Sequence, residues 1–159
     1  MFAIGDFAVC PGHGVGQICD IEEKQVGDDT KVFYIIKLTN NGLKIMVPTD
    51  NKSGIRRLAG EIEITKVFTL LSNHNVEVDT STWNRRYRDY MEKIKTGSLM
   101  EIADVLRSLF LLRHRKGLSF GEKKMLNHCK ELLVQEIALS KGNEKQAISN
   151  QIEACFSIN

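Results

Sequence analysis

Hydrophobic and polar positions follow two different periods along the chain, and the change falls near residue 60. Before it, apolar residues form short runs separated by turn residues, as at 7–10 and 32–38. Short apolar runs bounded by Gly, Pro and Asn are typical of β-strands. Four or five such strands in under 60 residues predict a small, strongly bent antiparallel barrel of the SH3 or Tudor kind.

Glycine-containing segments separate these runs. Residues 40–42 read Asn-Asn-Gly and predict a hairpin, because Asn-Gly tolerates positive φ at both central turn positions. Residues 12–16 form a GxGxG pattern, but Gln17 stands where a dinucleotide-binding fingerprint has its last glycine. No Lys-Ser or Lys-Thr pair follows, so the pattern is not a phosphate-binding loop either. We interpret it as a tight turn at a corner of the barrel.

From about residue 60, apolar residues recur every three or four positions, which is the period of an amphipathic helix. Ser/Thr/Asp/Asn caps and terminal glycines divide this region into five helices. The expected helices and their signals are 60–74, a helix capped by Asp79-Thr80-Ser81 and ended by Gly97, one from Ser98 to Gly117, one from Ser119 to Gly142, and one from Asn143 to Phe156. The predicted fold is therefore α+β, with a barrel domain over 1–58 and a compact helical bundle over 59–159.

Composition excludes several classes of protein. The chain has 159 residues, of which 42% are hydrophobic and 26% charged, so it is globular rather than disordered. No apolar run approaches the length of a membrane span, and the start lacks the basic and apolar regions of a secretory signal. Four cysteines without a CxxC pair suit neither a disulfide scaffold nor a zinc site. We expect a cytoplasmic protein that does not contact a membrane.

No constellation in the sequence predicts catalysis. The histidines at 13, 74, 114 and 128 show no metal-ligand spacing with one another or with cysteine. No nucleophile elbow is present, and no acid and base converge on one segment. We therefore expect no enzymatic activity, no cofactor and no metal. A monomer is expected, because no long self-pairing heptad pattern occurs.

The distribution of charge is more informative than its sum. The net charge is +2, but residues 83–124 carry eleven Lys/Arg against five Asp/Glu. A basic segment in a weakly charged protein indicates a local patch for an anionic partner such as nucleic acid. The alternative is that these charges only solvate several faces of the helices.

The most basic stretch also holds the only tryptophan. Trp83 begins a helical stripe with Tyr87, Tyr90, Met91 and Ile94, a pattern that also fits a core residue. Arginines at 85, 86 and 88 flank it, and three positive charges in the first turns oppose the helix macrodipole. An aromatic wedge ringed by arginine suits a protein that disturbs stacked bases while holding phosphates.

A second candidate surface lies on the strand at 43–48. Alternation places Leu43, Ile45 and Val47 on one face and Lys44, Met46 and Pro48 on the other. Pro48 suits an edge strand, since it cannot donate to a ladder. An exposed apolar edge strand can bind a partner, unless the helical bundle covers it.

Several motifs, in order along nearly the whole chain, resemble those of the CarD/CdnL family of bacterial RNA-polymerase-binding transcription regulators, and specifically its CdnL type. The motifs are VCPGHGVG at 9–16, LKIMVP at 43–48, WNRRY at 83–87, MEKIKTG at 91–97 and GLSFGEKKML at 117–126. The chain departs from the family at Cys10, where Tyr is common, and at Met46, where some members carry a basic residue.

The resemblance implies a Tudor-like domain that docks on the RNA polymerase β subunit and a helical domain that contacts promoter DNA at the upstream edge of the melted bubble. The implied β-binding residues are Lys24, Lys44, Met46 and Pro48, and the implied DNA-binding residues are Trp83 as wedge, Arg85, Arg86 and Arg88 on phosphates, and Lys123. Such contacts read no bases, so low sequence specificity is expected at promoters opened by polymerase with its primary sigma factor. The protein would then be associated with the nucleoid through polymerase.

Other functions remain compatible with the residues alone. An RNA- or ribosome-binding factor could pair an SH3-like barrel with basic helices. A polymerase adaptor could use the strand edge and ignore DNA. Within the family, stabilising an open complex can either aid initiation or slow promoter escape, so activation and repression are both open.

Overall fold

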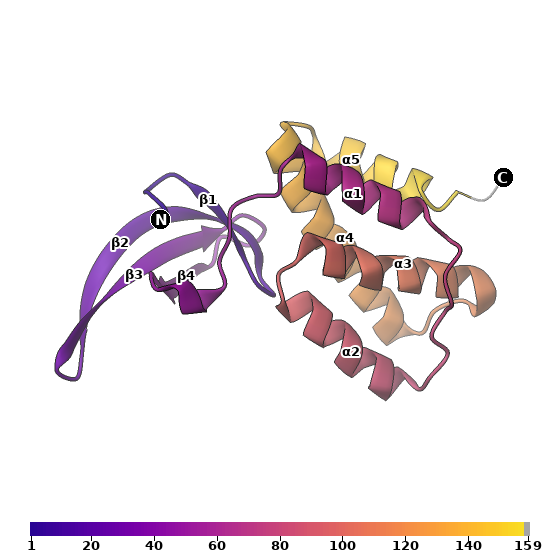
Figure 1. The fold of residues 1–159 in the computed structure, drawn as a ribbon, viewed down its shortest axis with the longest axis horizontal. Helices are drawn as coiled ribbons and strands as arrows, with labels where there is room; N and C mark the ends of the chain where they lie inside the picture. Colours follow the sequence, from indigo (N-terminus) through magenta and orange to yellow (C-terminus); the bar gives the residue numbers. More distant parts are fainter. Residues whose placement is uncertain (158–159) are drawn as a thin grey trace. The chain divides into compact units, whose positions relative to one another are not determined.

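The computed structural model describes residues 1–157, with residue 51 described by its backbone only. The chain divides into two compact units, Met1–Leu58 and the remainder from Ala59 onward (Figure 1). The first is a four-stranded antiparallel half-barrel of the Tudor-like kind, and the second is a bundle of five helices in its described part. The predicted α+β fold class is confirmed.

The half-barrel is a meander whose strands pair in chain order. Its strands are β1 (Phe7–Cys10), β2 (Gly14–Val26), β3 (Asp29–Leu38) and β4 (Lys44–Pro48), with β1 and β4 at the edges. β2 and β3 are much longer than their neighbours, so their outer ends form a two-stranded ribbon from Glu23↔Val32 to Val26↔Asp29 (Figure 1). A register shift between Ile18 and Asp20 places a bulge where β2 bends.

A small core lies inside the half-barrel, and one glycine permits its close packing. The core residues are Ala8, Cys10, Ile18, Tyr34, Ile36 and Leu38. A Cβ at Gly16 would lie 2.3 Å from Cγ2 of Ile36, so no other residue fits without movement of β3. The interpretation of the glycine cluster as a tight corner is confirmed, since Gly12 and Gly14 both adopt positive φ in the β1–β2 connection.

The β3–β4 hairpin differs from the expected two-residue turn. The connection between the two strands spans 39–43, and in it the Gly42 amide donates to the Leu38 carbonyl at 3.0 Å. Within this loop only Gly42 adopts a positive φ, whereas the predicted turn needs positive φ at two positions. Among the described residues, only glycines adopt it. The strand begins at Lys44, and Leu43, expected to face inward, is exposed.

The helical unit contains α1 (Glu61–Ser72), α2 (Trp83–Lys95), α3 (Leu99–Lys116), α4 (Phe120–Lys141) and α5 (Lys145–Ala154). A short 3-10 turn, η1 (Asn51–Ser53), follows β4 within the preceding unit. α3 packs against α1, α2 and α4, and is therefore the central helix of the bundle (Figure 1). Leu99, Leu106, Leu109 and Phe110 of α3 are fully buried. The expected apolar stripe of α1 is confirmed by the burial of Ile64, Val67 and Leu71.

Helix starts were predicted with mixed success. The capping box of α4 is complete, since the Ser119 and Glu122 side chains each accept from the other's backbone amide. The predicted cap of α2 within Asp79-Thr80-Ser81 is wrong, because the N-cap is Thr82 without a side-chain bond and Asp79 accepts from the Ser81 amide in a separate turn. α5 begins at Lys145 with no side-chain cap, so the expected cap at Asn143 is wrong. These errors move helix starts by a few residues and leave the bundle unchanged.

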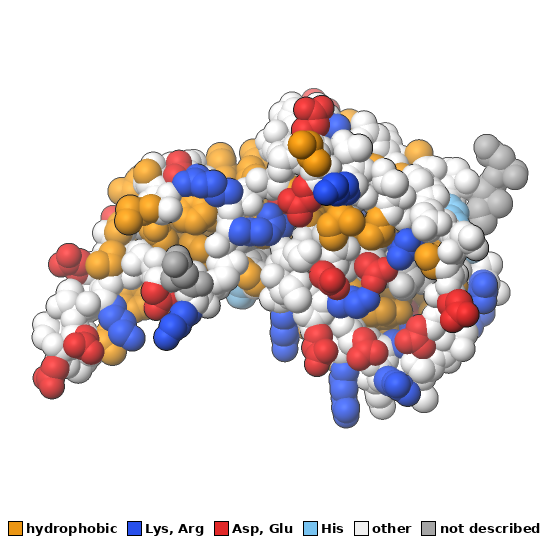
Figure 2. All heavy atoms as spheres, viewed as in Figure 1, with side chains coloured by type: hydrophobic (Ala, Val, Ile, Leu, Met, Phe, Trp, Pro, Cys, Tyr) orange, Lys and Arg blue, Asp and Glu red, His pale blue; other side chains and the backbone are white. Residues whose placement is uncertain are grey.

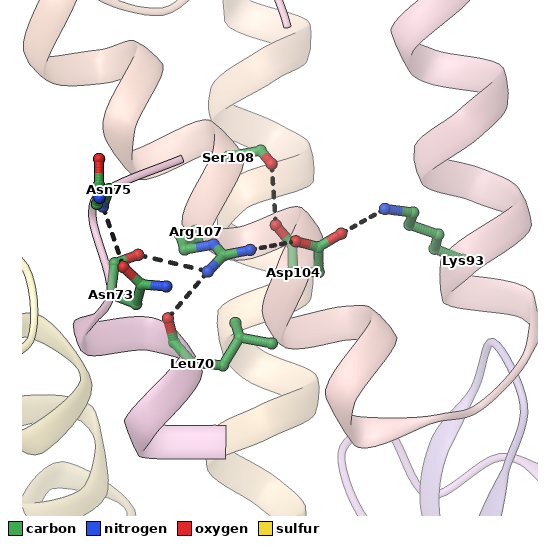
Figure 3. A network of polar contacts seen from close by, with 7 residues as sticks. All are labelled: Leu70, Asn73, Asn75, Lys93, Asp104, Arg107 and Ser108. Atoms are coloured by element: carbon green, nitrogen blue, oxygen red, sulfur yellow. Dashed lines mark hydrogen bonds and ion pairs between the residues drawn. The ribbon is translucent and has the colours of Figure 1, made fainter. Parts of the chain in front are cut away.

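A polar network ties the central helix to two neighbours (Figure 3). Asp104 of α3 accepts from Lys93 of α2 and, at 2.8 Å, from Arg107 one turn along α3. Arg107 also donates to the Leu70 carbonyl, at 3.2 Å, near the end of α1. The Leu70 carbonyl also accepts from the Asn73 amide at 3.1 Å, so Arg107 adds a second donor at the C-terminal end of α1. The network therefore has a structural role in fixing α1 and α2 on α3.

Candidate nucleic-acid interface

Trp83 is the first residue of α2, and four residues hold its indole ring in place. The Tyr87 and Tyr90 rings lie 5.7 and 6.3 Å from it, and the Arg86 guanidinium stacks over it at 5.2 Å. On the α4 side, a Cβ at Gly121 would lie 3.2 Å from the indole nitrogen, so the ring rests on bare backbone. We call Arg86, Tyr87, Tyr90 and Gly121 the Trp83 seat. Trp83 is partly buried in this seat, since it packs against the helical core without being fully enclosed.

Arg86 is the buried element of the seat. It is only 3% exposed, and its Nη1 donates to Oε2 of Glu122 at 3.0 Å. Its Nε donates to the Ser81 carbonyl, also at 3.0 Å. Glu122 accepts in turn from the Ser119 amide at 3.0 Å. The first turn of α2 is thus joined to the first turn of α4 directly beneath the tryptophan.

Electrostatics keep this pair charged. Burial works to raise the pKa of the Glu122 carboxyl, but hydrogen bonds from Ser119 and Arg86 outweigh it and lower that pKa below its usual range. For Arg86, burial works to lower the pKa, whereas Tyr90 and Glu122 raise it above its ordinary value. Both side chains therefore stay ionised at neutral pH and form a rigid, charge-neutral base for the indole.

The buried pair corrects one expectation about the arginines. The interpretation of Arg86 as a phosphate contact does not fit this structure, since its guanidinium is enclosed and paired with Glu122. Its spacing already placed it beside the core, because 83, 86 and 90 follow the three- and four-residue steps of one helix face. The pairing with Glu122 also neutralises one of the three positive charges at the start of α2. It therefore reduces the unfavourable interaction of those charges with the helix macrodipole.

The other predicted DNA-contacting cations lie in solvent. Arg85, Arg88 and Lys123 are all exposed, and within residues 1–157 none of them forms an ion pair with a carboxylate. Arg85 and Arg88 share the first turns of α2 with Trp83, whereas Lys123 lies in the first turn of α4. The packing of Trp83 on Gly121 brings these two helix starts together. A half-open indole with free cations on both helices suits contact with a polyanion.

The predicted polymerase-facing residues fall on one face of the sheet. Register pairs Lys24 with Lys31 on β3, and cross-strand partners point to the same side of a sheet. Likewise Lys44 pairs with Lys37, Met46 with Ile35, and Pro48 with Phe33. Because positions 31, 33, 35 and 37 alternate along β3, all four predicted residues share the outer face. Met46 is 47% exposed there, whereas Ile45 and Val47 pack on the core as expected.

Two residues of this face were missed. Phe33 and Ile35 are half-buried and extend the apolar surface between Pro48 and Met46. The signal was present in the run 32–36, which is apolar at every position, whereas a strand with one solvent face alternates. We use the name Met46 face for the surface formed by Phe33, Ile35, Met46 and Pro48. The lysines at its margin, Lys24, Lys31, Lys37 and Lys44, are included in this name. Figure 2 shows hydrophobic side chains gathered over the first unit, while acidic and basic side chains intermix on the visible part of the helical unit.

Other kinds of site find little support. Within residues 1–157 there is no group of three or more His, Cys, Asp and Glu placed to hold a metal ion. Burial raises the pKa of the Cys10 thiol to about 11 and that of Cys129 to about 12, so neither is a thiolate at neutral pH. None of the helices in the described chain combines the length and the hydropathy that a membrane span needs.

Comparison with known families assigns both units. Residues 2–59 match the CarD-like/TRCF RID domain, and residues 66–153 match the CarD C-terminal domain. A relative from Bacillus subtilis (strain 168), named "Putative transcription factor YdeB", is 35% identical over 149 residues, which is 92% of this chain and 97% of that protein. A Tudor-like half-barrel and a five-helix bundle, matched in this order, define a two-part transcription regulator. The chain belongs to the CarD family of such regulators, as its CdnL-type motifs indicated.

Proposed function

We propose that this protein binds the RNA polymerase β subunit through the Met46 face and stabilises the open promoter complex through Trp83. The proposal places the indole as a wedge in the minor groove at the upstream edge of the melted DNA. Arg85 and Arg88 contact phosphates beside it, and Lys123 contacts one further away. The protein would act in the cytoplasm, on the nucleoid, at promoters occupied by polymerase with its primary sigma factor.

The observation that carries this proposal is the Trp83 seat. The indole is braced by a guanidinium 5.2 Å away and by the Gly121 backbone, yet Trp83 is not fully enclosed. A wedge must resist being pushed back when it enters between bases, because unstacking a step costs a few kcal/mol. Exposed cations on both adjoining helices supply the phosphate contacts that such a wedge needs.

The mechanism follows from differential binding. Melted promoter DNA re-anneals unless something binds the open state better than the closed one. A preference of about 1.4 kcal/mol for the distorted fork changes the open-to-closed ratio roughly tenfold. One aromatic contact with a few phosphate contacts is sufficient for this preference. Because few phosphates are involved, affinity for free DNA should be weak and salt-sensitive, and tethering to polymerase supplies the effective concentration.

The Met46 face suits the tether. It joins a free edge strand, β4, to an apolar surface with lysines at its margin. An edge strand offers unpaired backbone groups for strand addition, and the side chains beside it confer specificity. The family's CarD-like/TRCF RID domain, matched over residues 2–59, supports polymerase as the partner.

The lifetime of the open complex at a ribosomal RNA promoter tests both contacts. Wild type should lengthen the lifetime several-fold, and both Trp83→Ala and Met46→Glu should abolish the effect for different reasons. Met46→Glu should lose binding to the β subunit, whereas Trp83→Ala should bind β normally. Leu43→Glu is a matched control for the added charge, since Leu43 is exposed just outside β4. An unchanged lifetime with Trp83→Ala would refute the wedge.

Two other functions give different results in this assay. A polymerase adaptor without a DNA contact would bind β, yet Arg85→Glu and Trp83→Ala would be silent. An RNA- or ribosome-binding factor would bind RNA and leave the open complex unchanged. The Trp83 seat favours the wedge over both, because an adaptor has no need of a braced, half-open indole among cations.

A further inference from the structure

Phe120, the first residue of α4, stands out among the exposed hydrophobic side chains of the helical unit. Its side chain is 84% exposed, although leaving a phenyl ring in water costs more free energy than leaving most other side chains there. The capping box at 119 and 122 does not require an aromatic residue at this position. Within residues 1–157, the Phe120 ring therefore has no place in the buried core and no part in the helix cap.

The surroundings of Phe120 are cationic. Lys123 and Lys124 follow three and four residues later, so all three side chains share one face of α4. Both lysines are exposed, and helical side chains lean towards the N-terminus, over the turn that holds Phe120. The one acid of this turn, Glu122, is buried against Arg86 and does not offset their charge at the surface.

Phe120 also lies next to the proposed wedge. Its neighbour along the chain, Gly121, forms the floor on which the Trp83 indole rests. A DNA fork held by Trp83, as proposed above, would therefore lie beside the helix turn that carries Phe120. The two aromatic residues come from different helices, α2 and α4, and so offer two separate contact points at one end of the bundle.

We propose that Phe120 stacks on an unpaired base of the melted strand at the fork, while Lys123 and Lys124 contact the flanking phosphates. The inference rests on the proposed wedge function and adds a second aromatic contact specific for single-stranded DNA. Inside a duplex both faces of a base are covered by its neighbours, so away from the duplex ends the ring can stack only on an unpaired base. A protein partner would have to cover Phe120 and also supply a carboxylate for each of the two ammonium groups, because the one acid of this turn is already paired with Arg86.

Binding of the whole 159-residue chain to two DNA molecules at low salt provides the test. One is a blunt duplex, and the other has the same duplex joined to an unpaired branch with 2-aminopurine at its first unpaired position. Phe120→Ala should weaken binding to the fork about fivefold or more and abolish the fluorescence change, while duplex binding stays unchanged. Phe120→Trp should retain both signals. Ile62→Ala, which truncates an exposed side chain on α1, is the matched control and should behave as wild type.

The outcomes separate this inference from the proposal on which it rests. If Phe120→Ala binds the fork as wild type does while Trp83→Ala loses it, the wedge stands and stacking by Phe120 is refuted. Equal losses on fork and duplex would also refute stacking, since that result describes a general contact. If wild type shows no preference for the fork, the wedge and the stacking contact fall together.

Discussion

Arg85 and Arg86 are neighbours with the same side chain, yet their surroundings give them opposite roles. Arg85 is exposed on the face of α2 that carries Arg88, whereas Arg86 is enclosed between the indole and Glu122. A helix turns about 100° per residue, so adjacent positions face different environments. At this scale, the proposed function assigns the exposed Arg85 to a phosphate and the enclosed Arg86 to the support of the tryptophan.

Substitution of each arginine by alanine should separate these roles. Arg86→Ala leaves the Glu122 carboxylate buried without its partner, and we expect a loss of about 3–5 kcal/mol in the free energy of unfolding. Arg85→Ala should change it by less than about 0.5 kcal/mol. In DNA binding, Arg85→Ala should instead reduce the slope of log K against log salt by about one. Urea unfolding and a salt titration measure the two effects, and similar unfolding midpoints would contradict the assignment.

The Glu122 carboxyl should also make stability depend on pH. Hydrogen bonds from Ser119 and Arg86 lower its pKa in the folded state, against the effect of burial. Its contribution is therefore fully present above the ordinary pKa of 4.5 and is lost as the pH falls through the lower folded value. The stability difference between wild type and Glu122→Gln should narrow as pH falls below about 4.5. Urea unfolding from pH 7 to pH 3 measures it, and a constant difference would show that Glu122 is not responsible.

At the scale of elements, the first turn of α4 combines several roles in four residues. Ser119 and Glu122 close the capping box, Gly121 supports the indole, and Phe120 faces solvent. Because the same turn both begins a helix and supports the Trp83 indole, the position of that ring is set by helix packing rather than by a loop. Sites on regular elements hold their geometry more closely than sites on loops.

Gly121→Ala should move the indole without unfolding the helix. The added Cβ would lie 3.2 Å from the indole nitrogen, closer than ordinary contact, so the ring must shift by a few tenths of an ångström. Alanine improves helix propensity by up to about 1 kcal/mol, so the net change in stability should be small. Trp83 is the only tryptophan, so its emission spectrum reports the shift directly. We expect the emission maximum of Trp83 to shift to longer wavelength. An unchanged spectrum would contradict the contact between Gly121 and the indole.

At the scale of the whole molecule, the two units have very unequal cores. The hydrophobic core of the half-barrel consists of six buried residues, whereas the helical unit has a much larger core to which all five helices contribute. Small domains bury too little surface to be stable alone unless other features support them. Ala59 begins the helical unit, since its amide donates to Glu136 and its carbonyl accepts from Ser140.

A fragment of residues 59–159 should therefore fold by itself. It retains the helical core, the Trp83 seat and both bonds made by Ala59. We expect a cooperative thermal transition by circular dichroism, with the tryptophan emission of the whole chain. A fragment of residues 1–58 should be markedly less stable. Absence of a cooperative transition in the 59–159 fragment would show that the helical unit depends on the half-barrel.

Much of the element plan was accessible from local pattern. The change of period near residue 60, the apolar stripe of α1 and the α4 capping box each depend on residues close in sequence, so the sequence predicted them. The errors at α2 and α5 arose because several residues could serve as the cap, and the structure uses a separate Asp79–Ser81 turn or no side-chain cap at all. The sequence shows which residues are of a type that can cap a helix, but tertiary packing decides which of them, if any, does so.

By itself, the sequence determined the fold class, the outward alternation of Lys44 and Met46 along β4, and the clustering of Trp83 with arginines, because these follow from periodicity within single elements. Only the tertiary structure decided that Arg86 is enclosed and paired with Glu122, that Phe33 and Ile35 join the Met46 face, and that Gly121 lies against the indole. The physical reason is the same in each case. Residues far apart in sequence, such as 83 with 121 and 35 with 46, become neighbours only when helices and strands pack, and those neighbours set the burial and charge on which function depends.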